Sequence, residues 1–192
     1  MLKELFISEV RIKLLKTILP HPDSQFHVRA LVRAVGSEIN AIRRELAKLE
    51  GVGLLHKRKS SNRVYYSADT SCMFYPELLS LLGKEMGLGA SIVKYQKQLG
   101  DVKYAVLARD FLRGRAPTVL DVDLFVVGRV NEDVLKRIVS DEEKVLKREI
   151  NFTVMNEEDF LHRKRRNDNF VTRFLIQSRT MLIGDEADFC AL

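Results

Sequence analysis

Two aspartates, Asp121 and Asp123, stand two residues apart at the start of an apolar run, Leu124–Val127. On a β-strand, residues i and i+2 lie on the same face, so this spacing would bring two carboxylates together. Such a pair can bind Mg²⁺ and orient a nucleotide triphosphate for in-line attack, which is the chemistry of two-metal phosphoryl transfer. Because Asp-x-Asp is a common tripeptide, this interpretation depends on the residues around the pair.

A second set of residues has the chemistry of nucleic-acid recognition. After Ser37, Ile39, Ile42, Leu46 and Leu49 recur at three- and four-residue steps, which predicts a helix with these residues inward. The opposite face would present Ser37, Asn40, Ala41, Arg43, Arg44 and Lys48. An α-helix fits the major groove, where arginine can pair with guanine and asparagine with adenine, so this face is a candidate for base readout. The alternative is a solvated face with Glu45 as a salt-bridge partner.

Basic residues also surround a turn that follows this helix. Two strand-like runs, residues 54–59 and 63–67, are joined by Ser60-Ser61-Asn62 and predict a β-hairpin. Its candidate DNA contacts are Lys57, Arg58, Lys59, Asn62 and Arg63. These side chains could straddle the DNA backbone or enter the minor groove. The alternative is that the charges protect an edge strand from pairing with another chain.

Two shorter helices are expected before these elements. Ser8 can cap a helix over residues 9–19, and a second helix over residues 27–35 would end at Gly36. Ser37 would then cap the third helix. Three short helices followed by a basic hairpin are the elements of a winged helix-turn-helix.

The positive charge of the chain is concentrated in the same region. The net charge is +6, yet residues 1–67 contain 13 Lys and Arg against 6 Asp and Glu, a balance of +7. Residues 68–192 contain 19 and 20, a balance of −1. A basic excess confined to one module is expected of a polyanion binder.

Other features of the sequence point to a cytoplasmic protein. No apolar run approaches the roughly 20 residues that span a bilayer, and the first residues do not resemble a secretory signal. Cys72 and Cys190 are far apart, and the four histidines lack ligand spacing. We therefore expect neither a disulfide nor a zinc site.

The segment HVRALVRAVGSEINAIRRELAKLEGVGLLHKRKSSNRVYYSAD resembles the DNA-binding domains of the arsenic-repressor-like family of bacterial and archaeal regulators. Within it, RRELAKLEGVGLL followed by NRVYY is similar to that family's recognition helix leading into its wing. The resemblance implies a winged helix-turn-helix that binds double-stranded DNA. One such module covers few base pairs, so we expect a homodimer on a two-fold operator. The expected dimer surfaces are the helical stretch after Pro76 and Leu2, Leu5, Phe6 and Ile7.

From residue 102 onward, strand-like and helical runs alternate, which predicts a small α/β domain. The expected strands cover residues 102–108, 123–127 and 150–155, and the expected helices cover residues 132–146, 157–166 and 170–177. A helical stretch over residues 77–99 is expected to connect the domains, either as a packed linker or as a dimerisation or hinge helix. The predicted boundaries are 1–70, 71–100 and 101–192.

The segment YAVLARDFLRGRAPTVLDVDLFVVG is similar to the signature of the minimal nucleotidyltransferase family, which reads Gly-Ser, two residues, Arg-Gly and then Asp-x-Asp. The segments REINFTVMNEEDF and MLIG also match the domain that accompanies this kind of winged helix in fused regulators. When Arg113-Gly114 is set on the family's Arg-Gly, the family's Gly-Ser falls on Arg109-Asp110. The resemblance implies that the glycine admits the triphosphate and the hydroxyl holds a phosphate oxygen, whereas Arg109 is bulky and Asp110 repels the ligand.

The same resemblance implies a third carboxylate on the strand after Arg148, where Glu149 takes the place of the usual aspartate. We therefore expect a degenerate domain with no catalytic residues, in which Asp121, Asp123 and Glu149 are vestigial metal ligands. No cofactor is expected, since Mg²⁺ and a nucleotide triphosphate would be needed only by an active enzyme.

The sequence thus predicts a two-domain α+β or α/β protein. A winged helix-turn-helix would precede a small nucleotidyltransferase-like domain, whose mixed sheet has flanking helices. The predicted function is that of a sequence-specific DNA-binding transcriptional regulator. The alternatives are an active nucleotidyltransferase that modifies a protein or a small molecule, and an antitoxin-like protein-interaction module.

Overall fold

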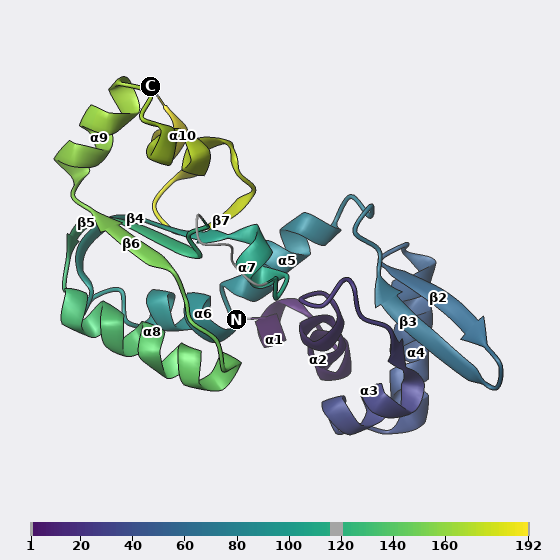
Figure 1. Ribbon diagram of the computed structural model, residues 1–192. Helices are drawn as coiled ribbons and strands as arrows, with labels where there is room; N and C mark the ends of the chain where they lie inside the picture. The colour runs from purple at the N-terminus through teal and green to yellow at the C-terminus, as the bar shows by residue number, and fades with distance from the viewer. Residues whose placement is uncertain (1, 116–120, 192) are drawn as a thin grey trace. The chain divides into compact units, whose positions relative to one another are not determined.

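The computed structural model describes residues 2–115 and 121–191 as a mixed α/β protein with eleven helices and two β-sheets (Figure 1). The chain divides into two compact units, Met1–Leu82 and Gly83–Leu192. The division falls inside the segment 71–100, which the sequence assigned to a linker. Among the described residues, no helix is long and apolar enough to cross a membrane.

The first unit is built on short helices that bury apolar side chains such as Leu15, Leu31 and Leu46. They are α1 (Leu2–Leu5), α2 (Glu9–Ile18), α3 (Val28–Val35), α4 (Ile39–Gly51) and α5 (Tyr75–Gly83), whose last residue belongs to the second unit. The Ser8 side chain accepts the Arg11 N–H at 3.2 Å, and Gly36 ends α3 in the left-handed conformation, so both predicted caps are confirmed. The predicted cap at Ser37 is wrong. Helix α4 starts after Glu38, which makes no side-chain capping bond, so the Ser37 hydroxyl is one residue too early in the chain.

The first sheet is antiparallel, with the strand order β1-β3-β2. Its strands are β1 (Phe26–His27), β2 (Leu55–Ser60) and β3 (Arg63–Ala68). The predicted hairpin is confirmed, and Ser60 pairs with Arg63 so that only two residues form the turn. The sequence did not predict β1, whose two residues pair with Tyr65 and Tyr66 on the central strand.

The second unit is a mixed four-stranded sheet with helices on both faces. Its strands, in the order β6-β5-β4-β7, are β4 (Gly100–Ala108), β5 (Leu124–Val130), β6 (Phe152–Met155) and β7 (Arg179–Ile183). Its helices are α6 (Gly87–Lys94), α7 (Arg109–Leu112), α8 (Glu132–Leu146), α9 (Glu157–Arg165), α10 (Asn169–Ile176) and α11 (Glu186–Cys190). Strands β5 and β6 are parallel, and the other pairs are antiparallel.

Alternate residues of β4 and β5 pack on opposite faces of this sheet. Leu107 and Val126 contribute to one core cluster with α6 and α8, whereas Val106 and Phe125 contribute to another with α9, α10 and α11. Figure 1 shows α6 and α8 on one face of the sheet and α9 and α10 on the other. Strands covered on both faces are apolar at successive positions, as the sequence of β5 is.

The predicted helix over residues 77–99 is wrong as a single element. The structure has two helices there, α5 and α6, separated by residues 84–86. Within the second unit, the backbone approaches itself closely at two glycines: a Cβ atom added to Gly89 would overlap the Gly83 carbonyl oxygen. Gly89 therefore permits a backbone contact that a larger residue would prevent.

Candidate nucleic-acid interface

The outward face of α4 is polar and accessible, as its apolar periodicity predicts. Ile42, Leu46 and Leu49 are buried in the core of the first unit. The side chains predicted to read bases are divided by exposure: Asn40, Arg43, Arg44 and Lys48 are exposed, and Ser37 and Ala41 are half-buried. Ile39 was expected in the core but is only half-buried, because it lies at the start of the helix.

A half-buried ion pair fixes α4 against α2. Glu45 is 8% exposed, and its carboxylate accepts a hydrogen bond from Arg11 Nε at 2.7 Å. Lys48 Nζ lies 3.6 Å from the same carboxylate, on the exposed side. Burial alone would raise the pKa of Glu45, but the hydrogen bond and the charge of Arg11, with smaller effects from Ser8 and Lys48, lower it below its ordinary value. Glu45 therefore remains ionised and holds α4 in place.

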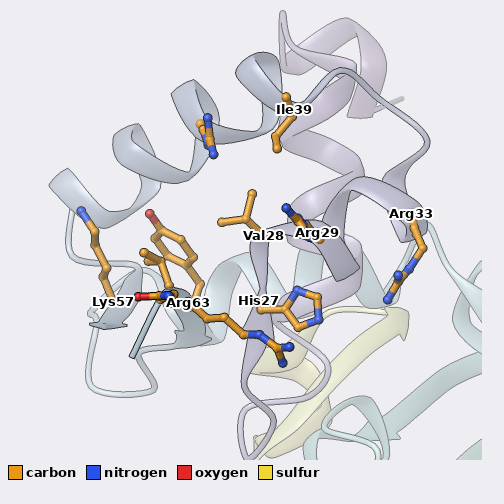
Figure 2. A pocket seen from close by; sticks show the side chains of 11 residues that line it. His27, Val28, Arg29, Arg33, Ile39, Lys57 and Arg63 are labelled. Atoms are coloured by element: carbon orange, nitrogen blue, oxygen red, sulfur yellow. The ribbon is translucent and has the colours of Figure 1, made fainter. Parts of the chain in front are cut away.

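A groove of about 730 Å³ runs between α3, the first turns of α4 and the hairpin (Figure 2). Five cationic side chains line it: Arg29, Arg33, Arg43, Lys57 and Arg63. The rest of its lining comes from His27, Asn62, Tyr66 and three apolar residues, Val28, Ile39 and Val64. None of the lining residues is acidic, so the groove is suited to a polyanion.

His27 and Tyr66 line the groove and provide neutral hydrogen-bond donors. The His27 Nδ1 atom accepts the Ala30 N–H at 3.1 Å and so caps α3. Because Nδ1 is the acceptor, the proton of the neutral ring is on Nε2, which can donate to a ligand. Burial raises the pKa of Tyr66, although the positive charges of Lys57 and Arg43 act in the opposite direction. Its hydroxyl therefore remains a neutral hydrogen-bond donor.

The hairpin presents all of its predicted cations to solvent. Lys57, Arg58, Lys59 and Arg63 are exposed, and Asn62 lies in the turn. Of this predicted set, Lys57, Asn62 and Arg63 line the groove, whereas Arg58 and Lys59 extend the basic surface along β2 outside it.

Sequence reasoning missed the contribution of α3. His27, Arg29 and Arg33 line the groove but were not among the predicted DNA contacts. A signal for the two arginines was present, because residues four apart lie on one face of a helix. Figure 2 shows both side chains on α3, and the Arg63 side chain extending toward His27 from the hairpin.

The candidate metal ligands of the second unit lie before the strands on which they were expected. Strand β5 begins at Leu124, so Asp121 and Asp123 precede it, and Glu149 precedes β6. Asp121 and Glu149 are exposed, whereas Asp123 is 3% exposed. The predicted placement of the two aspartates on one face of a strand is therefore wrong. In the described part of the chain, no three His, Cys, Asp or Glu side chains form a group that could hold a metal ion.

Asn151 connects the two aspartates. Its backbone N–H donates to Asp123 Oδ2, and its side-chain amide donates to the Asp121 carbonyl oxygen, both at 3.1 Å. Burial raises the pKa of Asp123, while the Asn151 N–H and the charge of Arg148 partly oppose that effect. The Asp123 carboxyl group therefore gains proton affinity.

At Arg109-Asp110, which the sequence comparison aligned with the phosphate-binding Gly-Ser, the acidic side chain is paired with arginines of the same unit. The Asp110 carboxylate lies 3.1 Å from Arg115 Nη1 and 3.7 Å from Arg113 Nη1. The Arg148 guanidinium stacks over the Phe111 ring, with 4.8 Å between its central carbon and the ring centre. Residues 116–120 of the compared segment lie outside the described part of the chain.

Comparison with protein-family models gave no match, nor did comparison with curated proteins or with solved structures. The family resemblances therefore remain expectations, carried by the sequence segments quoted for them.

Proposed function

We propose that the protein is a transcriptional regulator that binds specific sequences in double-stranded DNA. In this proposal the first unit is a winged helix-turn-helix, α4 is its recognition helix and the β2–β3 hairpin is its wing. The observation that carries the proposal is the groove, where five cations and no acid lie beside the exposed polar face of α4. We further propose that the protein acts in the cytoplasm as a homodimer.

Each element of this surface has a place in such a complex. Helix α4 has the dimensions to enter the major groove, where Asn40 and Arg44 would reach base edges. The exposed Arg58 and Lys59 of β2 would contact the backbone or the minor groove beside it. Glu45 of α4 is buried and paired with Arg11, so its charge is compensated within the protein.

The test is a fluorescence-anisotropy titration of the full chain with labelled duplexes selected from fragments of the native genome. We expect a selected duplex to bind more tightly than a scrambled one of equal length, with affinity falling steeply between 50 and 200 mM salt. Equal affinity for all sequences would contradict regulation of specific genes. Lack of affinity for any duplex at low salt would contradict DNA binding altogether.

For the second unit we propose a degenerate nucleotidyltransferase domain without transfer activity. The support is Asp110, which stands where the resemblance places a phosphate-holding hydroxyl and is paired with Arg115. At about 4 Å and an effective dielectric constant near 20, repulsion between an uncompensated carboxylate and a phosphate is on the order of 4 kcal/mol, or about a thousandfold in affinity, and the pairing with Arg115 offsets part of it. We expect little heat when the protein is titrated with ATP and Mg²⁺.

One observation favours the alternative of an active nucleotidyltransferase. Asp123 is buried beside Asp121 and bears a raised pKa, and perturbed carboxyl groups are frequent at catalytic sites. The discriminating experiment is incubation of cell extract with labelled nucleotide. Transfer that disappears in Asp123→Asn would establish the enzyme, whereas the proposal predicts no transfer by either protein.

A further inference from the structure

The cations of the groove are largely uncompensated. Within the described residues, Arg29, Arg33, Arg43 and Arg63 form no ion pair, and only Lys57 approaches a carboxylate, at 3.5 Å. The arginines of the second unit that flank Asp110 are, by contrast, paired with that carboxylate. Like charges gathered without a counter-charge repel one another. An anion from outside the protein would relieve that repulsion.

The lining distinguishes an extended anion from a small organic ligand. Pockets for small molecules are mostly apolar with a few polar groups. Eight of the eleven residues that line this groove are polar or charged, and they come from β1, α3, α4 and the hairpin with its turn. Charged groups spread over several elements can follow a backbone that carries one charge at each repeat.

Different residues of α4 line the groove and form the face proposed to read bases. Ile39 and Arg43, one turn apart, line the groove, whereas the neighbouring exposed residues Asn40 and Arg44 do not. Residues four apart share a face, so the two pairs form adjacent stripes along the helix. Arg43, which the sequence placed among the base-reading residues, belongs to the groove stripe.

We infer that the groove binds the sugar-phosphate backbone of one DNA strand and that affinity and sequence choice are carried by different residues. Arg29 and Arg33 of α3, with Arg43, Lys57 and Arg63, bind phosphates, and the outward stripe of α4 selects the bases. The inference rests on the proposed DNA binding and adds α3 to the interface. Phosphate contacts position a protein on DNA without reading its sequence.

The test uses a paired variant of the full chain, Arg29→Gln with Arg33→Gln. Its matched control, Lys97→Gln with Arg137→Gln, removes the same charge from exposed positions of the second unit. Affinity for a selected duplex and for a scrambled duplex is measured across a series of salt concentrations. Thermal unfolding of both variants is measured beside the titrations to establish that each is folded.

For the α3 variant we expect the slope of log affinity against log salt to become shallower by about two, one for each lost phosphate contact. The same relation gives a loss of about tenfold per contact at 0.1 M salt, equal for both duplexes. The control variant should match the unaltered protein. If the unaltered protein binds DNA and the α3 variant keeps its slope, the inference fails while the proposed function stands. If the unaltered protein binds no duplex, the proposed function itself fails.

A second arm distinguishes the DNA backbone from a free phosphate. Inorganic phosphate is titrated into the protein–DNA complex at constant ionic strength, with sodium chloride as the reference. We expect phosphate to displace DNA no better than chloride does, since a single anion engages few of the five cations at once. Displacement at millimolar phosphate that is lost in the α3 variant would overturn the inference and identify a small-anion site.

Discussion

Glu45→Gln removes the negative charge that holds α4 against α2. The loss of unfolding free energy that this causes follows from the contacts of the carboxylate. The Glu45 carboxylate is bonded to Arg11 at 2.7 Å, and the Arg11 side chain is 30% exposed. A hydrogen bond to a charged group contributes about 1.5–3 kcal/mol, and an exposed ion pair about 0–1 kcal/mol. This pair lies between the two cases, so we expect the variant to lose about 1–2 kcal/mol of unfolding free energy.

The same variant makes a prediction about pH. The pKa of Glu45 is lowered in the folded protein from the ordinary value of 4.5. The stabilisation by a carboxylate of lowered pKa is present above the unfolded pKa and is lost as the pH falls through the folded pKa. The difference in stability between the unaltered protein and Glu45→Gln should therefore be complete at neutral pH and should shrink below about pH 4.5.

The assay is urea unfolding followed by far-ultraviolet circular dichroism, at neutral pH and at acidic pH. Glu9→Gln is the matched control, because Glu9 also pairs with a lysine, at 2.8 Å, but its side chain is 62% exposed. We expect the control to change stability little at either pH. Equal stability of Glu45→Gln and the unaltered protein at neutral pH would refute the role given to this pair. A difference that persists at acidic pH would show that the lost stability does not come from the charge.

Three further predictions concern base selection, backbone packing and assembly. Arg44→Gln should change the preferred base pair at one operator position, by about 1–3 kcal/mol, while affinity for scrambled DNA falls little; sequence selection on random duplexes checks this. Gly89→Ala should destabilise the second unit by about 1–3 kcal/mol in urea unfolding, because the added Cβ meets the Gly83 backbone, which cannot move aside. Gly51→Ala is the control and should not destabilise the protein, since its Cβ would meet no atom within 4 Å. Sedimentation at micromolar concentration should show a dimer, and a species of 22.1 kDa alone, with and without DNA, would exclude the homodimer.

Much of the first unit could be predicted because its signals are local. The three- and four-residue spacing of Ile42, Leu46 and Leu49 predicted the buried face of α4, and turn-forming residues predicted the hairpin. Ser8 and Gly36 acted as caps because both depend only on the adjacent turn of helix. These features are encoded within a few residues, which is the range over which a pattern can be read.

The features that were missed depend on residues distant in sequence. Strand β1 has two residues and exists because Tyr65 and Tyr66 lie beside it, so no local pattern marks it. Strand β7 similarly pairs with β4, some 75 residues earlier in the chain. Arg29 of α3 and Arg63 of the hairpin line the same groove, and only the folded chain brings them to it.

The predicted positions of Asp121 and Asp123 differed from the observed ones for another reason. The sequence indicated where Asp123 stands relative to an apolar run, but the structure starts the strand one residue later. Asp123 then turns inward, to the Asn151 N–H, while Asp121 stays exposed. The alternation of faces holds only within a strand, so it does not place residues that precede one, and the pattern of apolar residues does not determine strand ends to one residue.

The pairing of β1 with β3 connects the hairpin to α3. His27 belongs to β1 and also caps α3, so the middle of β3 is joined through β1 to the first turn of that helix. A displacement of the hairpin would carry the start of α3 with it, and both walls of the groove would move together. The spacing between the cations of α3 and those of the hairpin is thus set within the protein. In the proposed complex, the DNA backbone would therefore meet cations whose spacing the protein itself sets.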